Sequence, residues 1–480
     1  MKLYDTLADI QRDLSTGLLT CSDLVDFYLG RINAQPEINA FVEVFSEEAK
    51  SAAALVDEKL RAGTAGKLAG LVLGIKDVLC YKGHGLTASS TILNGFESMI
   101  TATVVERLLA EDAIIIGRQN CDEFAMGSSN ENSTYGPVRN PVDPSRVPGG
   151  SSGGSAAAVK AGMCHASLGS DTGGSVRQPA TFCGLVGLKP TYGRVSRWGL
   201  IAYASSFDQI GPITRSVEDA ALLLSFMAGP DGKDNTASTQ PVPDYLPLKS
   251  MDAPRKIGYL KEVLESPGLD QEIKRQQEAL LQACQEAGHE VVELTFPLLK
   301  YLVPCYYILT TAEASSNLSR YDGVHYGHRS SEGEDLASVY LNSRSEGFGE
   351  EVQRRIMLGT FVLSAGYADD YYLKAMKVRR LIREQSLTLL ETCDVLLTPT
   401  TPTPAFQIGE KTEDPVEMFL SDVFTVHANL AGLPAISFPW GTHSTQLPIG
   451  MQLMGRPFEE AALLTFAEQL SRLKNLPKTD

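Results

Sequence analysis

The chain has 480 residues, of which 43% are hydrophobic and 21% are charged, and its formal net charge is −16. This length allows two or three average domains or one large α/β unit. The negative charge argues against a broad nucleic-acid-binding surface, because phosphate binding requires clustered lysine and arginine.

The first residues lack the basic head and apolar core of a signal peptide, and no apolar run approaches the ~18 residues that cross a bilayer. We therefore expect a cytoplasmic protein. The eight cysteines are scattered, without a CxxC pair or metal-ligand spacing. We expect them to be reduced thiols and expect no metal site.

The first third of the chain combines helical and strand patterns. Apolar periodicity predicts helices at 7–14, 22–32, 47–62 and 104–110, with Ser22 as the N-cap of the second. Short apolar runs predict buried strands at 71–75 and 113–116. A helix at 155–161 and a strand at 164–168 follow.

The rest of the chain repeats this alternation. We predict a helix at 216–227, a surface connection at 229–247, a strand at 256–260, a helix at 271–287 and a strand at 290–295. Residues 352–390 read as mostly helical, 395–397 and 435–438 as strands, and 459–473 as a closing helix. Such alternation predicts an α/β fold with a mixed central sheet covered by helices on both sides.

Two glycine- and serine-rich loops, 148–155 and 169–175, flank a short apolar segment. The interpretation of these loops as a flexible linker is not favoured, because they lie between elements that are predicted to pack. The hypothesis that these loops bind a phosphate group has little support, since the sequence contains neither a Walker pattern nor GxGxxG. The GxSxG spacing at 149–153 is typical of a serine hydrolase elbow, but a proline-broken segment precedes it and His165 lies in a predicted buried strand. A Ser-His-Asp triad therefore stays open but unsupported.

A lysine is a better candidate for the base. Lys76 ends the apolar run at 71–75, where burial would lower the pKa of its amine by several units. Segments 74–77, 148–155 and 169–177 together resemble the three defining blocks of the amidase signature family. That resemblance implies Lys76 as base, Ser151 as a bridging serine in a cis peptide bond after Gly150, and Ser175 as nucleophile. It also implies an oxyanion hole from the backbone N–H groups of Thr172, Gly173 and Gly174.

Segments 123–133, 313–323 and 354–360 resemble one branch of that family, the glutamine-hydrolysing subunits of tRNA-dependent amidotransferases. The resemblance implies a glutaminase that supplies ammonia for the ATP-dependent conversion of Glu-tRNA(Gln) to Gln-tRNA(Gln). It further implies two partner subunits, one of which uses ATP and Mg²⁺ and makes most of the tRNA contacts. No cofactor is expected in this chain.

Free glutamine carries a carboxylate and an ammonium group, so its site needs both charges. By resemblance, Arg355 would hold the α-carboxylate and Asp422 the α-ammonium, with help from Tyr306 in preference to Tyr307. The resemblance also implies the amidase signature fold as one domain over 1–480. Its parts would be N-terminal helices at about 1–65, a catalytic core at about 66–230, and a second half at about 250–480 that completes the sheet and the pocket.

Two alternatives remain open from the sequence. A stand-alone amidase of the same family would share Lys76, Ser151 and Ser175 but act on other amides. A non-catalytic scaffold subunit would need none of them.

Overall fold

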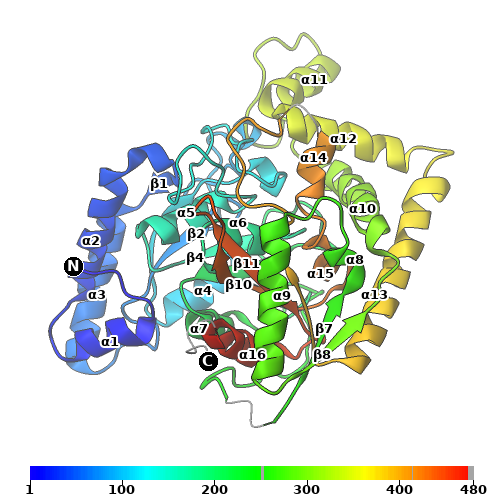
Figure 1. Cartoon of the computed structure of the whole chain (residues 1–480). Coiled ribbons are helices and arrows are strands. Elements are labelled where there is room, and N and C mark those ends of the chain that lie inside the picture. The colour runs from blue at the N-terminus through cyan, green and yellow to red at the C-terminus, as the bar shows by residue number, and fades with distance from the viewer. Residues whose placement is uncertain (250–252, 413–414, 474–480) are drawn as a thin grey trace.

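One eleven-stranded sheet organises the computed structural model, which describes residues 1–249, 253–412 and 415–473 (Figure 1). The strand order is β1-β3-β2-β4-β6-β5-β10-β11-β9-β7-β8. The strands are β1 (Phe41–Val44), β2 (Val72–Lys76), β3 (Ile114–Gln119), β4 (Ala166–Asp171), β5 (Val186–Lys189), β6 (Gln209–Thr214), β7 (Lys256–Leu260), β8 (Glu290–Leu294), β9 (Val395–Pro399), β10 (Ala435–Thr442) and β11 (Pro448–Met454).

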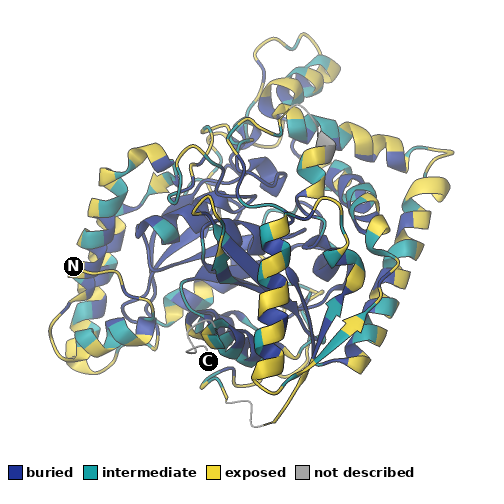
Figure 2. Ribbon diagram, in the orientation of Figure 1, coloured by how far each residue is buried: buried dark blue, intermediate teal, exposed yellow. Residues whose placement is uncertain are grey.

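The sheet is mixed, which confirms the predicted fold class. Strand β2 runs parallel to both β3 and β4, and β7 runs parallel to both β8 and β9, whereas the other neighbours are antiparallel. Every residue of β2, β3, β4, β5, β6 and β9 is buried, so both faces of the sheet are covered. The edge strands β1 and β8 are partly exposed, as Figure 2 shows for the outer elements.

Helices surround this sheet, and the N-terminal ones lie at the β1 end (Figure 1). The α-helices are α1 (Leu7–Ser15), α2 (Cys21–Ala34), α3 (Ser46–Ala62), α4 (Thr103–Ala110), α5 (Gly153–Ala161), α6 (Arg177–Phe182), α7 (Val217–Met227), α8 (Lys261–Leu264), α9 (Gln271–Glu286), α10 (Leu302–Asn317), α11 (Leu336–Gly347), α12 (Glu350–Leu363), α13 (Lys374–Thr392), α14 (Pro415–Leu420), α15 (Val426–Ala431) and α16 (Glu460–Leu473). Within the described residues, no helix is both long and apolar enough to span a membrane.

The predicted N-cap of the second helix is wrong. The Thr20 side chain accepts a hydrogen bond from the Asp23 backbone, and the Asp23 side chain accepts one from the Thr20 backbone, which is a capping box. Ser22 lies inside the helix, where its hydroxyl donates to Asp57. The cap is thus set by the reciprocal bonds of Thr20 and Asp23, not by the nearest serine.

Other elements differ from the prediction in their bounds or were not predicted, among them β1. The strand expected at 164–168 is β4, which begins at Ala166 and continues through Asp171 into the second loop. The apolar patterns did not predict β5, β6 and β11, all of which contain glycine, or helix α10. The region at 352–390 consists of two helices, α12 and α13, joined by a short π-helical turn. Parts of the predicted second half, 250–252, 413–414 and 474–480, lie outside the described residues.

Candidate active site

Lys76 lies at the carboxyl end of β2, beside the end of β4. The two strands are parallel with Ile75 paired to Leu168, so the positions that follow face each other at one edge of the sheet. The Nζ atom of Lys76 lies 2.7 Å from Oγ of Ser151 and 3.0 Å from Oγ of Ser170. The lysine is fully buried. Its amine therefore meets two hydroxyl groups in a site from which bulk water is excluded.

Burial changes the protonation of this amine. Desolvation lowers the pKa of Lys76 to about 8, although nearby acidic groups such as Asp122 and Asp171 oppose the shift. At pH 7 about one molecule in ten then holds a neutral amine, compared with about one in three thousand for an exposed lysine. Lys76 can consequently accept a proton near neutral pH.

The Gly150–Ser151 peptide bond is cis, in agreement with what the resemblance implies. Two hydrogen bonds and close packing fix this segment. The Gly150 N–H donates to Oε1 of Gln178 at 2.8 Å, and the Asp122 N–H donates to the Ser151 carbonyl at 3.1 Å. A Cβ atom at position 150 would lie 2.1 Å from Oδ2 of Asp122, so only glycine fits there. The surrounding residues thus hold the Ser151 hydroxyl toward Lys76.

Ser175 follows the loop that leaves β4. Its carbonyl accepts a hydrogen bond from the Ser152 N–H at 3.2 Å, which connects the two serine-rich loops. Among the described residues, Ser175 Oγ makes no hydrogen bond, and the side chain keeps 8% exposure, whereas Ser151 and Lys76 keep none. The structure therefore joins Lys76 to Ser151 directly and leaves the Ser175 hydroxyl as the accessible member of the three.

The loop between β4 and Ser175 is held by Asp171. Its carboxylate accepts two hydrogen bonds from Arg177 at 3.0 Å each. These contacts lower the pKa of Asp171 to about 2, although burial alone would raise it. The Gly174 N–H also donates to Asp171, at 2.9 Å, so this group of the predicted oxyanion hole already has an acceptor. Within the described residues, the N–H groups of Thr172 and Gly173 have none.

Arg355 on α12 and Asp422 are both buried near the adjacent tyrosines of α10. The Arg355 guanidinium lies 5.3 Å from the centre of the Tyr307 ring, and the Tyr307 hydroxyl lies 3.4 Å from Oδ2 of Asp422. Tyr306 points to the oxyanion loop instead, because a Cβ atom on Gly173 would lie 2.5 Å from its hydroxyl. Tyr307 thus lies between the two charges, and Tyr306 lies beside the reacting centre.

The hydrogen bonds of Arg355 leave part of its guanidinium unused by the protein. Its Nε donates to Glu351 at 2.8 Å and its Nη1 donates to the Tyr203 hydroxyl at 2.8 Å. In the described part of the chain, Nη2 has no hydrogen-bond acceptor. That group is suited to bind a carboxylate.

Burial raises the pKa of Asp422 to about 7, and a hydrogen bond from the Ser128 hydroxyl at 2.6 Å opposes the rise. The carboxylate is therefore ionised mainly above neutral pH. Below that range it loses the charge that would attract an ammonium group.

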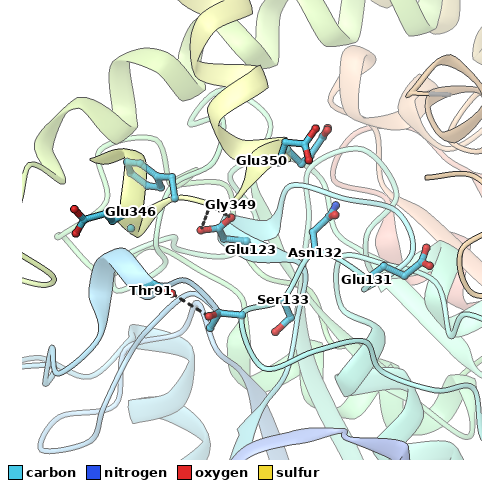
Figure 3. Close-up of a pocket in the computed structure, with 12 residues that line it drawn as sticks. Thr91, Glu123, Glu131, Asn132, Ser133, Glu346, Gly349 and Glu350 are labelled. Atoms are coloured by element: carbon cyan, nitrogen blue, oxygen red, sulfur yellow. Dashed lines mark hydrogen bonds between the residues drawn. The ribbon is translucent and has the colours of Figure 1, made fainter. Parts of the chain in front are cut away.

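A cavity of about 270 Å³ lies where α11 and α12 meet the first half of the chain (Figure 3). Its walls carry the acidic side chains of Glu123, Glu131, Glu346, Glu350 and Glu351, the last of which also bonds to Arg355. Glu123 accepts a hydrogen bond from the N–H of Gly349, the N-cap of α12. This hydrogen bond satisfies a free N–H group at the start of the helix that carries Arg355, while burial raises the pKa of Glu123 to about 7. The acidic lining would repel the carboxylate of an amino acid, so this cavity does not suit glutamine.

Three contact residues were not predicted from the sequence: Ser170 beside Lys76, Ser128 beside Asp422, and Tyr203 beside Arg355. Ser170 lies inside the glycine- and serine-rich loop at 169–175, but only the register of β2 and β4 reveals its neighbour. Among the described residues, neither buried histidine bonds to Ser151 or Ser175, since His165 bonds to Asp219 and His427 to Ser386, so no Ser-His-Asp triad forms at these serines. No cluster of metal-binding side chains is found among the described residues.

Known proteins are similar to this chain over nearly its whole length. The family model described as Amidase matches residues 23–464. A Chlorobium chlorochromatii protein, named as the glutamyl-tRNA(Gln) amidotransferase subunit designated A, is 53% identical over 467 residues, which cover 97% of this chain and 98% of that protein. Its namesake in Salinibacter ruber is 49% identical and covers 96% of this chain and 98% of its own length. The crystal structure of the Thermotoga maritima protein of that name aligns with a TM-score of 0.78 at 42% identity, over 95% of this chain and 92% of that one.

Proposed function

The chain belongs to the amidase family, and from that premise we propose that it hydrolyses glutamine as the amidase-family subunit of a glutamyl-tRNA(Gln) amidotransferase. The ammonia released would convert Glu-tRNA(Gln) to Gln-tRNA(Gln) in a multi-subunit, ATP-dependent enzyme. Two further subunits would complete this complex, one of which would use ATP and Mg²⁺ and contact the tRNA. The names of the relatives described above support this assignment.

One observation carries the choice of substrate. A buried cation, Arg355, and a buried anion, Asp422, lie on either side of Tyr307, and the adjacent Tyr306 touches the loop at Gly173. Opposite charges beside an oxyanion loop match a zwitterionic amino acid whose amide reaches the nucleophile. Each charge-assisted contact would contribute ~1.5–3 kcal/mol to binding. A stand-alone amidase that acts on apolar amides does not need the charged pair of Arg355 and Asp422. A non-catalytic scaffold does not need a buried lysine beside Ser151.

The reaction would proceed by acyl transfer. Neutral Lys76 takes the proton of the Ser151 hydroxyl, which takes the proton of Ser175 as its Oγ forms a bond to the amide carbon. N–H groups of the loop at Thr172 and Gly173 stabilise the oxyanion. The proton then passes back through Ser151 to the leaving nitrogen, the C–N bond breaks, and ammonia departs. Water hydrolyses the ester on Ser175 and releases glutamate.

A Ser175→Ala variant, assembled with its partner subunits, tests this proposal. The variant should lose glutamine hydrolysis by at least about 10³-fold, because no other hydroxyl can form the acyl-enzyme. It should keep amidation of Glu-tRNA(Gln) when ammonium salt is supplied. Ser155→Ala is the matched control, since Ser155 is a buried serine in the first turn of α5, near the site, whose hydroxyl donates only a long hydrogen bond to the Leu168 carbonyl at 3.4 Å. Glutaminase activity in Ser175→Ala at the control's level would overturn the assignment.

A further inference from the structure

The loop that precedes β6, defined here as residues 203–208, meets the oxyanion loop through strand register. Strands β4 and β6 are antiparallel with Asp171 paired to Gln209, so Thr172 and Asp208 lie opposite each other beyond the strand ends. The Thr172 hydroxyl donates to Oδ1 of Asp208 at 2.7 Å. The Asp208 carboxylate also accepts from the N–H groups of Tyr203 at 3.0 Å and Ala204 at 3.1 Å. One buried carboxylate therefore ties the whole loop to Thr172.

The other end of the same loop meets Arg355. The Tyr203 hydroxyl accepts a hydrogen bond from Nη1 of Arg355 at 2.8 Å, and the guanidinium lies 5.6 Å from the centre of the Tyr203 ring. Glu351 holds Nε of the same arginine. These two contacts fix the plane of the guanidinium and therefore the direction of Nη2.

Helices α10 and α13 hold the loop in place. Glu313 accepts from the Ser206 N–H at 2.9 Å, and Arg379 donates to the Ser206 carbonyl at 2.8 Å. The Arg379 guanidinium also lies 3.8 Å from the centre of the Phe207 ring, and that ring packs edge-on against Tyr306 at 5.8 Å. Because the loop is bonded on all sides, its two ends are positioned together and not independently.

We propose that residues 203–208 form a positioning element that connects the carboxylate-binding arginine to the oxyanion loop. Tyr203 directs Arg355 toward the substrate α-carboxylate, and Asp208 holds Thr172 where its N–H group faces the developing oxyanion. The inference rests on the proposed glutaminase function. It assigns specificity for an α-carboxylate to Tyr203 and a contribution to the rate of acylation to Asp208, although neither touches the reacting atoms.

Two variants separate these roles. Tyr203→Phe keeps the ring and the backbone bond to Asp208 but removes the acceptor for Arg355. It should raise the KM for glutamine by about tenfold or more, since a hydrogen bond to a charged group is lost, and change kcat less than about threefold. Asp208→Asn keeps the shape but cannot accept all three bonds. It should lower kcat by about tenfold or more with a smaller change in KM. Thr172→Val removes the same contact from the other side if Asp208→Asn does not fold.

Binding is measured separately by titrating glutamine into complexes that carry Ser175→Ala. Adding Tyr203→Phe should raise the Kd for glutamine by about tenfold. Tyr28 is a buried tyrosine of α2, and adding Tyr28→Phe should leave this Kd unchanged. Equal ammonium-dependent amidation in all variants shows that the complexes are assembled, and an unchanged midpoint of thermal unfolding excludes a general loss of structure in this chain. If the Ser175→Ala parent binds glutamine and Tyr203→Phe leaves both Kd and KM unaltered, the positioning role is wrong. If the parent does not bind glutamine and the wild type does not hydrolyse it, the proposed function itself fails.

Discussion

The protonation of Lys76 gives the sharpest prediction about the chemistry. With a pKa of about 8, the neutral fraction of its amine is about 1% at pH 6 and about 50% at pH 8. If the neutral amine is the base, the rate of acylation should rise about fiftyfold across that interval and level off above pH 9. An ordinary lysine would give a rise that continues beyond pH 10. Replacing Lys76 by arginine, which stays protonated, should lower the rate of acylation by a factor of about 10²–10⁴ at every pH.

The assay is ammonia release in a single turnover at saturating glutamine, from pH 5.5 to pH 10. This condition reports acylation and keeps weakened substrate binding out of the rate. Lys189 supplies the control, because it is a second buried lysine whose pKa desolvation lowers to about 7. A Lys189→Met variant should keep the midpoint near pH 8. A rate that is flat with pH in the wild type, or a Lys76→Arg variant with wild-type activity, would refute the reasoning.

Three further changes test other parts of the site and the core. Asp422 ionises above its pKa of about 7, so the KM for glutamine should rise about tenfold when the pH falls from 8 to 6. Asp422→Asn should abolish that pH dependence, and a constant KM in the wild type would exclude Asp422 as the group that binds the ammonium of glutamine. Gly173→Ala would place a Cβ atom 2.5 Å from the hydroxyl of the buried Tyr306 and should lower kcat about 100-fold, whereas near-normal kcat would mean that the loop can shift. Leu73→Ala, in fully buried β2, should lower the free energy of unfolding by about 2–5 kcal/mol in urea titrations, and a change below about 1 kcal/mol would contradict the packing described.

The buried strands near the site could be predicted because their apolar runs are short and continuous. The run that ends at Lys76 corresponds to β2, and the apolar run at 113–116 corresponds to the first half of β3. Strands β5 and β6 were missed because Gly187, Gly211 and Pro212 interrupt their patterns, although sheet pairing forms all the same. Glycine and proline have a low propensity for strands, but pairing with strands from distant parts of the chain outweighs that propensity in β5 and β6.

Contacts between distant segments could not be predicted from local pattern. Ser170 reaches Lys76 because β2 and β4 are parallel in one particular register, and a local pattern carries no record of that register. The choice between Tyr306 and Tyr307 has a similar cause. Successive residues on a helix point about 100° apart, and only the packing of α10 determines which neighbour each ring meets. In the structure Tyr306 meets Gly173 and Tyr307 meets Asp422, so the sequence could place both near the site but could not divide their contacts.

The partners of Lys76 explain how its amine can lose a proton without a histidine. Lys59, on the surface, has a carboxylate partner, Asp112, at 2.5 Å. A carboxylate in the same position beside Lys76 would favour the charged form of its amine. Around Lys76 the nearest carboxylates are engaged elsewhere: Asp122 accepts from the backbone of Asn130, and Asp171 accepts from Arg177. The amine is left with two neutral hydroxyl groups, which solvate either protonation state and transfer protons. Burial then lowers the pKa of Lys76, and the acidic groups nearby oppose this shift only in part. The nearby acids are thus arranged so that they hold the loops in place without fixing the charge of the base.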